Sequence, residues 1–146
     1  MTQMETTIES KSISLELANK LVEVAVEKGK ELGIPFSIAI VDRVGHLKTF
    51  ASMDGASVLS LDIAQNKAYS AIANNLATHE WYDQLKNEPA LLHGIVHTPR
   101  LIIFGGGYPI RLGDELIGGI GVSGGQYTED MQVCEAALSI LEELKA

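Results

Sequence analysis

The sequence has few of the residues that would point to cross-links, aromatic stacking or a polyanionic partner. A single cysteine, Cys134, excludes an internal disulfide bond and fits a reducing compartment. Aromatic residues make up 5% of the chain, so we expect a core of Val, Ile, Leu and Ala. Only 11 Lys and Arg stand against 19 Asp and Glu, and the net charge of −8 argues against a nucleic-acid or anionic-membrane partner.

Long hydrophobic runs are also missing. No stretch approaches the roughly 20 apolar residues of a membrane span, and residues 1–11 are polar, without the apolar segment of a signal peptide. We therefore predict a cytoplasmic protein with no membrane partner. The 146 residues are enough for one domain with a substantial core. We expect a flexible tail over residues 1–11 and a single domain over 12–146.

Hydrophobic periodicity predicts an α+β fold in the order α-β-β-α-α-β-β-β-α. The strands come as hairpins rather than singly between helices, which favours a mostly antiparallel sheet of about five strands with helices packed on it. Residue 33, a glycine, is placed to end the first helix. The expected helices are 14–32, 60–74, a short one from 78, and 128–144; the expected strands are 36–41, 47–51, a short buried strand at 101–104, 108–112 and 116–122.

Two glycine-rich stretches, 105–110 and 119–125, suggest a place where backbone approaches another molecule. The second leads into Thr128, a predicted N-cap, and a turn that opens a helix can bind an anion through its free N–H groups. The alternative, that these glycines serve only tight turns and close helix–sheet packing, stays open. The predicted ligand-binding residues from these stretches are Gly106, Gly107, Pro109, Ser123, Gly124 and Gly125.

Lys67 lies on an alanine-rich helix face that should be buried, so its ammonium needs a partner. It is a candidate to bind a ligand carboxylate or to act as a base. Alternatively it forms a structural ion pair with Asp42 or Asp54, which each follow a predicted strand. Both aspartates are candidate ligand-binding residues, and Asp42 is a candidate acid–base group; their alternative role is to accept hydrogen bonds in turns.

His93 and His97 are four residues apart, which would place them on one face of a helix. No third ligand or glutamate accompanies them, so we predict no metal site. Haem needs only one axial imidazole, which makes either histidine a candidate haem ligand, and surface histidines are the alternative. Cys134, beside apolar residues of the last helix, is expected to be a buried, inert thiol.

Five motifs in this order resemble the GlcG/HbpS-type family, often labelled haem-degrading, and the C-terminal domain of some corrinoid adenosyltransferases. The resemblance implies a profilin-like layered fold, a homo-oligomer, and a small pocket sometimes used for haem; many members are encoded in catabolic operons. The family often has arginine where this chain has Ser52, and the first helix lacks the histidine with which some members bind haem. The motifs are V-D-x-x-G-x-L (41–47), M-D-G-A (53–56), A-x-x-K-A (64–68), G-G-x-P-I (106–110) and I-G-x-I-G-V-S-G-G (117–125).

Together, these patterns predict a protein that binds a small anionic organic molecule or haem and is accessory to a catabolic pathway. Two alternatives remain. One is an enzyme that acts on a small catabolic intermediate by proton transfer through Lys67 or Asp42. The other is an accessory oligomer without chemistry. The expected partners are a small-molecule ligand and further copies of the chain, with haem as the possible cofactor.

Overall fold

The computed structural model describes residues 3–144 and confirms the α+β fold. Within those residues, no helix combines the length and apolar character needed to cross a bilayer. Short 3-10 helices occupy Thr78–Glu80 (η1), Ile95–His97 (η2) and Ser139–Glu143 (η3). The five α-helices and four strands are α1 (Leu15–Leu32), β1 (Ser37–Asp42), β2 (Leu47–Ser52), α2 (Val58–Ala73), α3 (Trp81–Leu85), α4 (Pro89–Gly94), β3 (Gly107–Leu112), β4 (Glu115–Ser123) and α5 (Tyr127–Leu138).

The four strands form one antiparallel sheet in the order β2-β1-β4-β3. Both predicted hairpins form, and they join through β1 and β4. In that pairing Ser37 lies opposite Ser123 at one end of the sheet, and Asp42 lies opposite Gly118 at the other. The two ends of β1 are about 16 Å apart at the usual rise of a strand.

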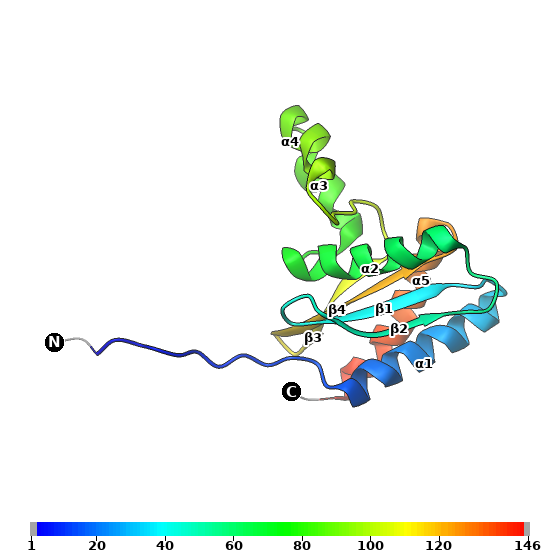
Figure 1. Ribbon diagram of the computed structural model, residues 1–146, viewed down its shortest axis with the longest axis horizontal. Coiled ribbons are helices and arrows are strands. Elements are labelled where there is room, and N and C mark those ends of the chain that lie inside the picture. The colour runs from blue at the N-terminus through cyan, green and yellow to red at the C-terminus, as the bar shows by residue number, and fades with distance from the viewer. Residues whose placement is uncertain (1–2, 145–146) are drawn as a thin grey trace.

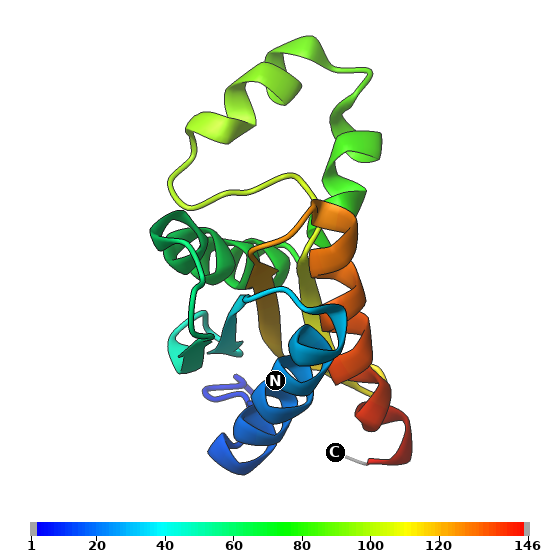
Figure 2. The same cartoon turned by 90° about the vertical axis from the view of Figure 1, so that its right-hand side faces the viewer.

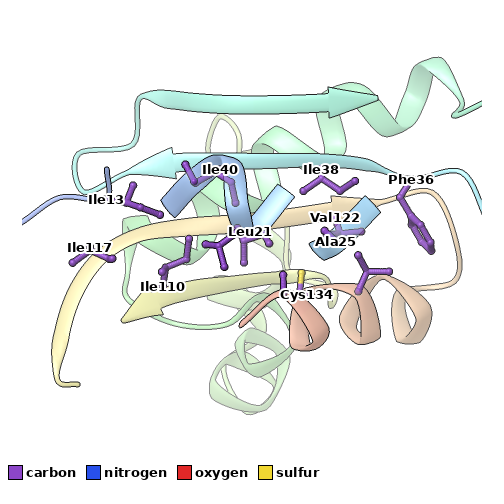
Figure 3. Packing of buried hydrophobic residues seen from close by; sticks show 14 residues of the cluster. Ile13, Leu21, Ala25, Phe36, Ile38, Ile40, Ile110, Ile117, Val122 and Cys134 are labelled. Atoms are coloured by element: carbon purple, nitrogen blue, oxygen red, sulfur yellow. The ribbon is translucent and has the colours of Figure 1, made fainter. Parts of the chain in front are cut away.

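Helices cover both faces of the sheet (Figure 1). Ile38 and Ile40 of β1 point to the face covered by α1 and α5, where they pack with Leu21 and Cys134 (Figure 3). The alternate β1 residues, Ala39 and Val41, face α2. Figure 2 shows α1 and α5 side by side on their face. The period-2 alternation of β1 therefore builds two apolar layers.

Glycines let α2 lie very close to the sheet. A Cβ added at Gly121 would collide with the Ala64 carbonyl oxygen, and one at Gly119 would lie 2.6 Å from the Ala68 oxygen. Neither glycine has a positive φ, so packing, rather than backbone conformation, requires them. The same holds for Gly107 of β3, where an added Cβ would collide with the Lys67 carbonyl oxygen.

The predicted strand at 101–104 is wrong, which leaves four strands instead of about five. The backbone here bonds to a side chain: the Ser70 hydroxyl donates to the Arg100 oxygen at 3.0 Å and accepts from the Ile102 N–H at 2.8 Å. Arg100 also has a φ of +69°, which is incompatible with an extended strand. The side chains of 101–103 are half-buried and Phe104 is exposed, so the run is apolar without being a core strand.

The ends of the chain and of α5 also differ from the expectations. Gln126, rather than Thr128, caps α5, and its N–H donates to Glu129 Oε1 at 2.8 Å, one half of a capping box. The α-helix ends at Leu138 and continues as η3 instead of reaching residue 144. Residues 3–12 are exposed and lie outside any helix or strand (Figure 1). Residues 1–2 of the predicted tail and 145–146 of the predicted domain lie outside the described residues.

Residues 78–100 form an arm that projects beyond α2 (Figures 1 and 2). The arm contains η1, α3, α4 and η2. Trp81 and Leu85 of α3 are buried, whereas α4 and η2 contain no buried residue. The outer half of the arm is therefore held to the body by few apolar contacts.

Candidate functional site

Lys67, in the middle of α2, is fully buried, as its alanine-rich face predicts. Its ammonium donates to Asp130 Oδ2 at 2.8 Å and to the Val122 carbonyl oxygen at 2.9 Å. The ring centroid of Phe104 lies 5.2 Å from Nζ, within the range of a cation–π contact. The partner of Lys67 is therefore Asp130, and the predicted pairing with Asp42 or Asp54 is wrong.

Asp130 is placed by the first turn of α5. Its side chain is 4% exposed, and its second oxygen, Oδ1, accepts the Gly125 N–H at 3.0 Å. Burial raises the pKa of the Asp130 carboxyl above its ordinary value, although the Lys67 ammonium opposes that rise. The carboxyl thus joins the Lys67 cation to the glycine turn that precedes α5.

Gly106 makes room for this pair. Its φ is +122°, and an added Cβ would lie 2.5 Å from Lys67 Nζ and 2.8 Å from the Val122 oxygen. A side chain here would displace the ammonium, so both the conformation and the space require glycine. The Gly106 oxygen accepts from the Val122 N–H at 2.8 Å and from Cys134 Sγ at 3.2 Å.

The buried Lys67–Asp130 pair is part of the lining of an open hollow of about 390 Å³, at the end of the sheet where β4 leads into α5. This volume is within the range of small-ligand sites. Four predicted residues therefore come together here: Lys67, Ser123, Gly124 and Gly125. The full lining is Ser57, Leu59, Ser60, Ile63, Lys67, Phe104, Ser123, Gly124, Gly125, Gln126, Tyr127 and Asp130.

The two other predicted aspartates lie elsewhere. Asp42 is in the β1–β2 turn, where its Oδ1 accepts the N–H groups of Val44 and His46 at 3.0 Å each. It is at the end of β1 opposite to the hollow, so it cannot act together with Lys67. Asp54 follows β2 and lines a separate surface groove with Lys30 of α1. The Asp42 contacts fit the turn role that was its alternative. Asp54 stands in the turn between β2 and α2.

Gly107 and Pro109 of β3 do not line the hollow. The Gly107 N–H donates to Thr78 Oγ1 of η1 at 2.9 Å. Pro109 lies opposite Gly119 in the β3–β4 pair. The 105–110 stretch thus contributes to the site mainly through Gly106, which borders Lys67. Its other glycines serve packing.

His93 and His97 belong to α4 and η2 of the arm, where both are exposed. Neither lines the hollow. Within residues 3–144, no three His, Cys, Asp or Glu side chains gather as a metal site. Cys134 is buried, and burial raises the pKa of its thiol, so it is the inert thiol that the sequence predicts.

Sequence reasoning missed Asp130, although a signal for it exists. Val133, Cys134 and Ala137 are the buried residues of α5, and Asp130 precedes them by three, four and seven positions. This spacing puts Asp130 on the buried stripe of the helix, where a carboxylate needs a cation. The neighbouring Glu129 is used in the capping box instead. The helical period therefore places Asp130 on the buried side of α5 and its neighbour Glu129 outside that side.

A family model described as "Haem degrading protein HbpS-like" matches residues 13–139. The chain belongs to the HbpS-like family. This confirms the family that the five motifs indicate. A 15.0 kDa protein of Citrobacter freundii from the dhaT-dhaS intergenic region is 38% identical to this HbpS-like chain over 135 residues, which cover 91% of this chain and 94% of the relative.

Solved structures of similar proteins agree with the HbpS-like fold. The Klebsiella pneumoniae protein ORFY has a TM-score of 0.89 and 31% identity, with 99% of this chain and 100% of ORFY covered. A structure described as a PduOC:heme complex has a TM-score of 0.81 and 33% identity, with 88% of this chain and 94% of that protein covered. The fold around the Lys67 hollow is thus that of a family with a haem-bound member.

Proposed function

We propose that this HbpS-like protein binds a small anionic organic molecule in the Lys67 hollow. The observation that carries the proposal is a buried ammonium that lines an open hollow. An ammonium has three donors, and Asp130 and Val122 account for two among the described residues. Because Lys67 is fully buried, the third can serve a ligand oxygen once the half-exposed Phe104 ring beside Nζ moves aside. Ser123 and Gln126, also in the lining, offer further polar groups.

The neighbouring Asp130 carboxylate would repel an anionic ligand unless it takes up a proton. Its pKa is already raised by burial, so a second negative charge in the hollow would favour the protonated form further. The Glu129 charge of α5 also raises the pKa of Asp130, whereas the Lys67 ammonium of α2 lowers it. Proton uptake at Asp130 thus makes an anion and the Lys67–Asp130 pair compatible in one site.

A titration with acetate and succinate, followed by calorimetry and by the shift in melting temperature, tests the proposal. We expect binding to the wild type and at least a tenfold weaker affinity in the Lys67→Met/Asp130→Asn variant, because a hydrogen bond to a charged group contributes about 1.5–3 kcal/mol. The double variant keeps the site polar but uncharged. Lys86→Met, which removes an exposed lysine of the arm, is the matched control and should bind as the wild type does. Equal affinities in all three proteins would contradict the proposal.

Haem is a second candidate ligand, supported by the PduOC:heme complex in the family. Haem iron in proteins is held by His, Cys, Met or Tyr side chains. His93 and His97 are poor candidates to hold a haem in the hollow, because both lie on the arm and neither lines the hollow. Tyr127, which lines the mouth and is half-exposed, is the residue of a suitable type. We therefore propose that Tyr127, rather than the two histidines, would hold the haem iron.

A haem titration followed by the Soret band tests this assignment. We expect a shifted Soret band with the wild type, loss of the shift in Tyr127→Phe, and an unchanged shift in the His93→Ala/His97→Ala variant. The Phe variant retains the ring and removes only the phenol oxygen. If the wild type gives no shift, the chain is not a haem binder. If the double histidine variant loses the shift, the arm histidines hold the iron.

We also propose an accessory role beside the enzymes of a catabolic pathway, and self-association to a homo-oligomer. The first is supported by the Citrobacter relative, whose gene lies between dhaT and dhaS. The second is implied by the family resemblance.

A further inference from the structure

Three large apolar side chains surround the mouth of the hollow and are exposed to water. Leu59 is 72% exposed, Tyr127 54% and Phe104 49%, and all three belong to the lining. They come from the first turn of α2, the first turn of α5 and the segment before β3, and we call them the apolar rim. Exposed apolar side chains that gather around one hollow mark a binding site more often than scattered single residues do.

The apolar rim lies next to the charged part of the hollow, the Lys67–Asp130 pair. The Phe104 ring lies 5.2 Å from Lys67 Nζ, so an aromatic face and the buried cation adjoin one another. Next to Phe104, Gly105 leaves space for the α5 side chains: an added Cβ would lie 3.2 Å from the Tyr127 ring and 2.6 Å from Met131 Sδ. Glycine at 105 thus allows the Tyr127 ring to pack close to the backbone next to Phe104.

This arrangement offers two kinds of contact at once, a cation at depth and apolar walls at the entrance. A small hydrophilic carboxylate would use only the first and leave the rim in water. A carboxylate attached to an aromatic ring would use both, because its ring would take apolar area of Phe104, Tyr127 and Leu59 out of water. A phenyl ring one methylene away from a carboxylate, as in phenylacetate, is close enough to that carboxylate for one molecule to reach both parts.

We propose that the ligand class of the Lys67 hollow is an aryl carboxylate, with the carboxylate at Lys67 and the ring between Phe104 and Tyr127. This inference rests on the proposed function and narrows it. The alternative occupant of the rim is a second copy of the chain, which would cover the apolar surface without any preference among ligands.

Calorimetric titration of acetate against phenylacetate tests the inference, since the two share a carboxylate and differ by the phenyl ring. We expect phenylacetate to bind at least tenfold more tightly to the wild type. Benzyl alcohol, which has the ring without the charge, should bind more weakly than phenylacetate. Equal affinities for acetate and phenylacetate would overturn the aryl assignment and leave anion binding intact. If neither acid binds, the proposed function itself fails.

Variants of the apolar rim give a second, independent test. Phe104→Ala and Tyr127→Ala should each lower the ratio of the phenylacetate affinity to the acetate affinity about threefold to tenfold. Both side chains are half-exposed, so the fold should be retained. Tyr82→Ala, which removes an equally exposed tyrosine from the arm, is the matched control and should change neither affinity. If the rim variants change only the molecular mass in light scattering and not the ratio of the two affinities, the rim is a contact between copies and the inference is wrong.

Discussion

The Lys67→Met variant is expected to lose about 2–4 kcal/mol of unfolding free energy at pH 7 and almost none at pH 4. Methionine replaces the aliphatic part of the lysine side chain in the core but leaves Asp130 buried without its cation. The carboxyl then folds in its protonated form, so its folded pKa rises far above the unfolded value of about 3.9. At pH 7 the cost of that protonation is at most about 4 kcal/mol.

The sign of the pH dependence follows from this linkage. A group whose folded pKa is raised contributes stability that is present below its unfolded pKa and lost as the pH rises through the folded pKa. The difference between wild type and Lys67→Met should therefore grow by about 1.4 kcal/mol per pH unit above the folded pKa of Asp130 in the wild type, until the still higher folded pKa of Asp130 in the variant is reached. Urea unfolding from pH 4 to 8 measures it.

The Lys67→Met/Asp130→Asn variant is the control for this interpretation. It removes both charges, so it should recover most of the lost stability at pH 7, and its stability relative to the wild type should depend less on pH. If Lys67→Met is equally destabilised at pH 4 and pH 7, the loss comes from packing rather than from the uncompensated carboxyl.

The Gly121→Ala variant is expected to lose more than about 3 kcal/mol of unfolding free energy. The added methyl group would collide with the Ala64 carbonyl oxygen of α2; that oxygen is a backbone atom, and the position of a Cβ is fixed by its own backbone. No change of rotamer can relieve such a contact, so α2 has to move away from β4.

Gly94→Ala is the matched control, since nothing lies within 4 Å of an added Cβ there and the φ of Gly94 is negative. It should be neutral or slightly stabilising, because alanine loses less backbone entropy than glycine. Urea unfolding compares the two variants and the wild type. A Gly121→Ala protein within 1 kcal/mol of Gly94→Ala, on the order of the usual alanine–glycine difference, would show that α2 and β4 are not tightly packed.

Periodicity was sufficient for the long helices and the two hairpins because each of those patterns fits one element only. Ser14 and Gly33 begin and end α1 as their residue types predict: the Ser14 hydroxyl accepts the Leu17 N–H, and Gly33 adopts the left-handed conformation. The apolar run 101–104 fits several structures, and a hydroxyl 30 residues away in sequence, that of Ser70, decides between them. Such a contact leaves no local pattern.

The glycine-rich stretches illustrate a second limit. Gly119 and Gly121 allow α2 to approach the sheet, whereas Gly106 makes room for an ammonium. Sequence gives the same residue type for both purposes, and only the atoms within about 3 Å of each glycine distinguish them. Lys67 and Asp130 are likewise 63 residues apart, so the carboxylate that faces the lysine could be found only from the helical phase of α5.

The link between Lys67 and Asp130 joins α2, on one face of the sheet, to α5, on the other, around the end of β4. Most other contacts between the two faces run through the strands. A molecule that binds to Lys67 would therefore contact a group that connects the helix layers on the two faces of the sheet. Ligand binding in this small hollow would therefore stabilise the packing of α2 and of α5, although the two helices lie on opposite faces of the sheet.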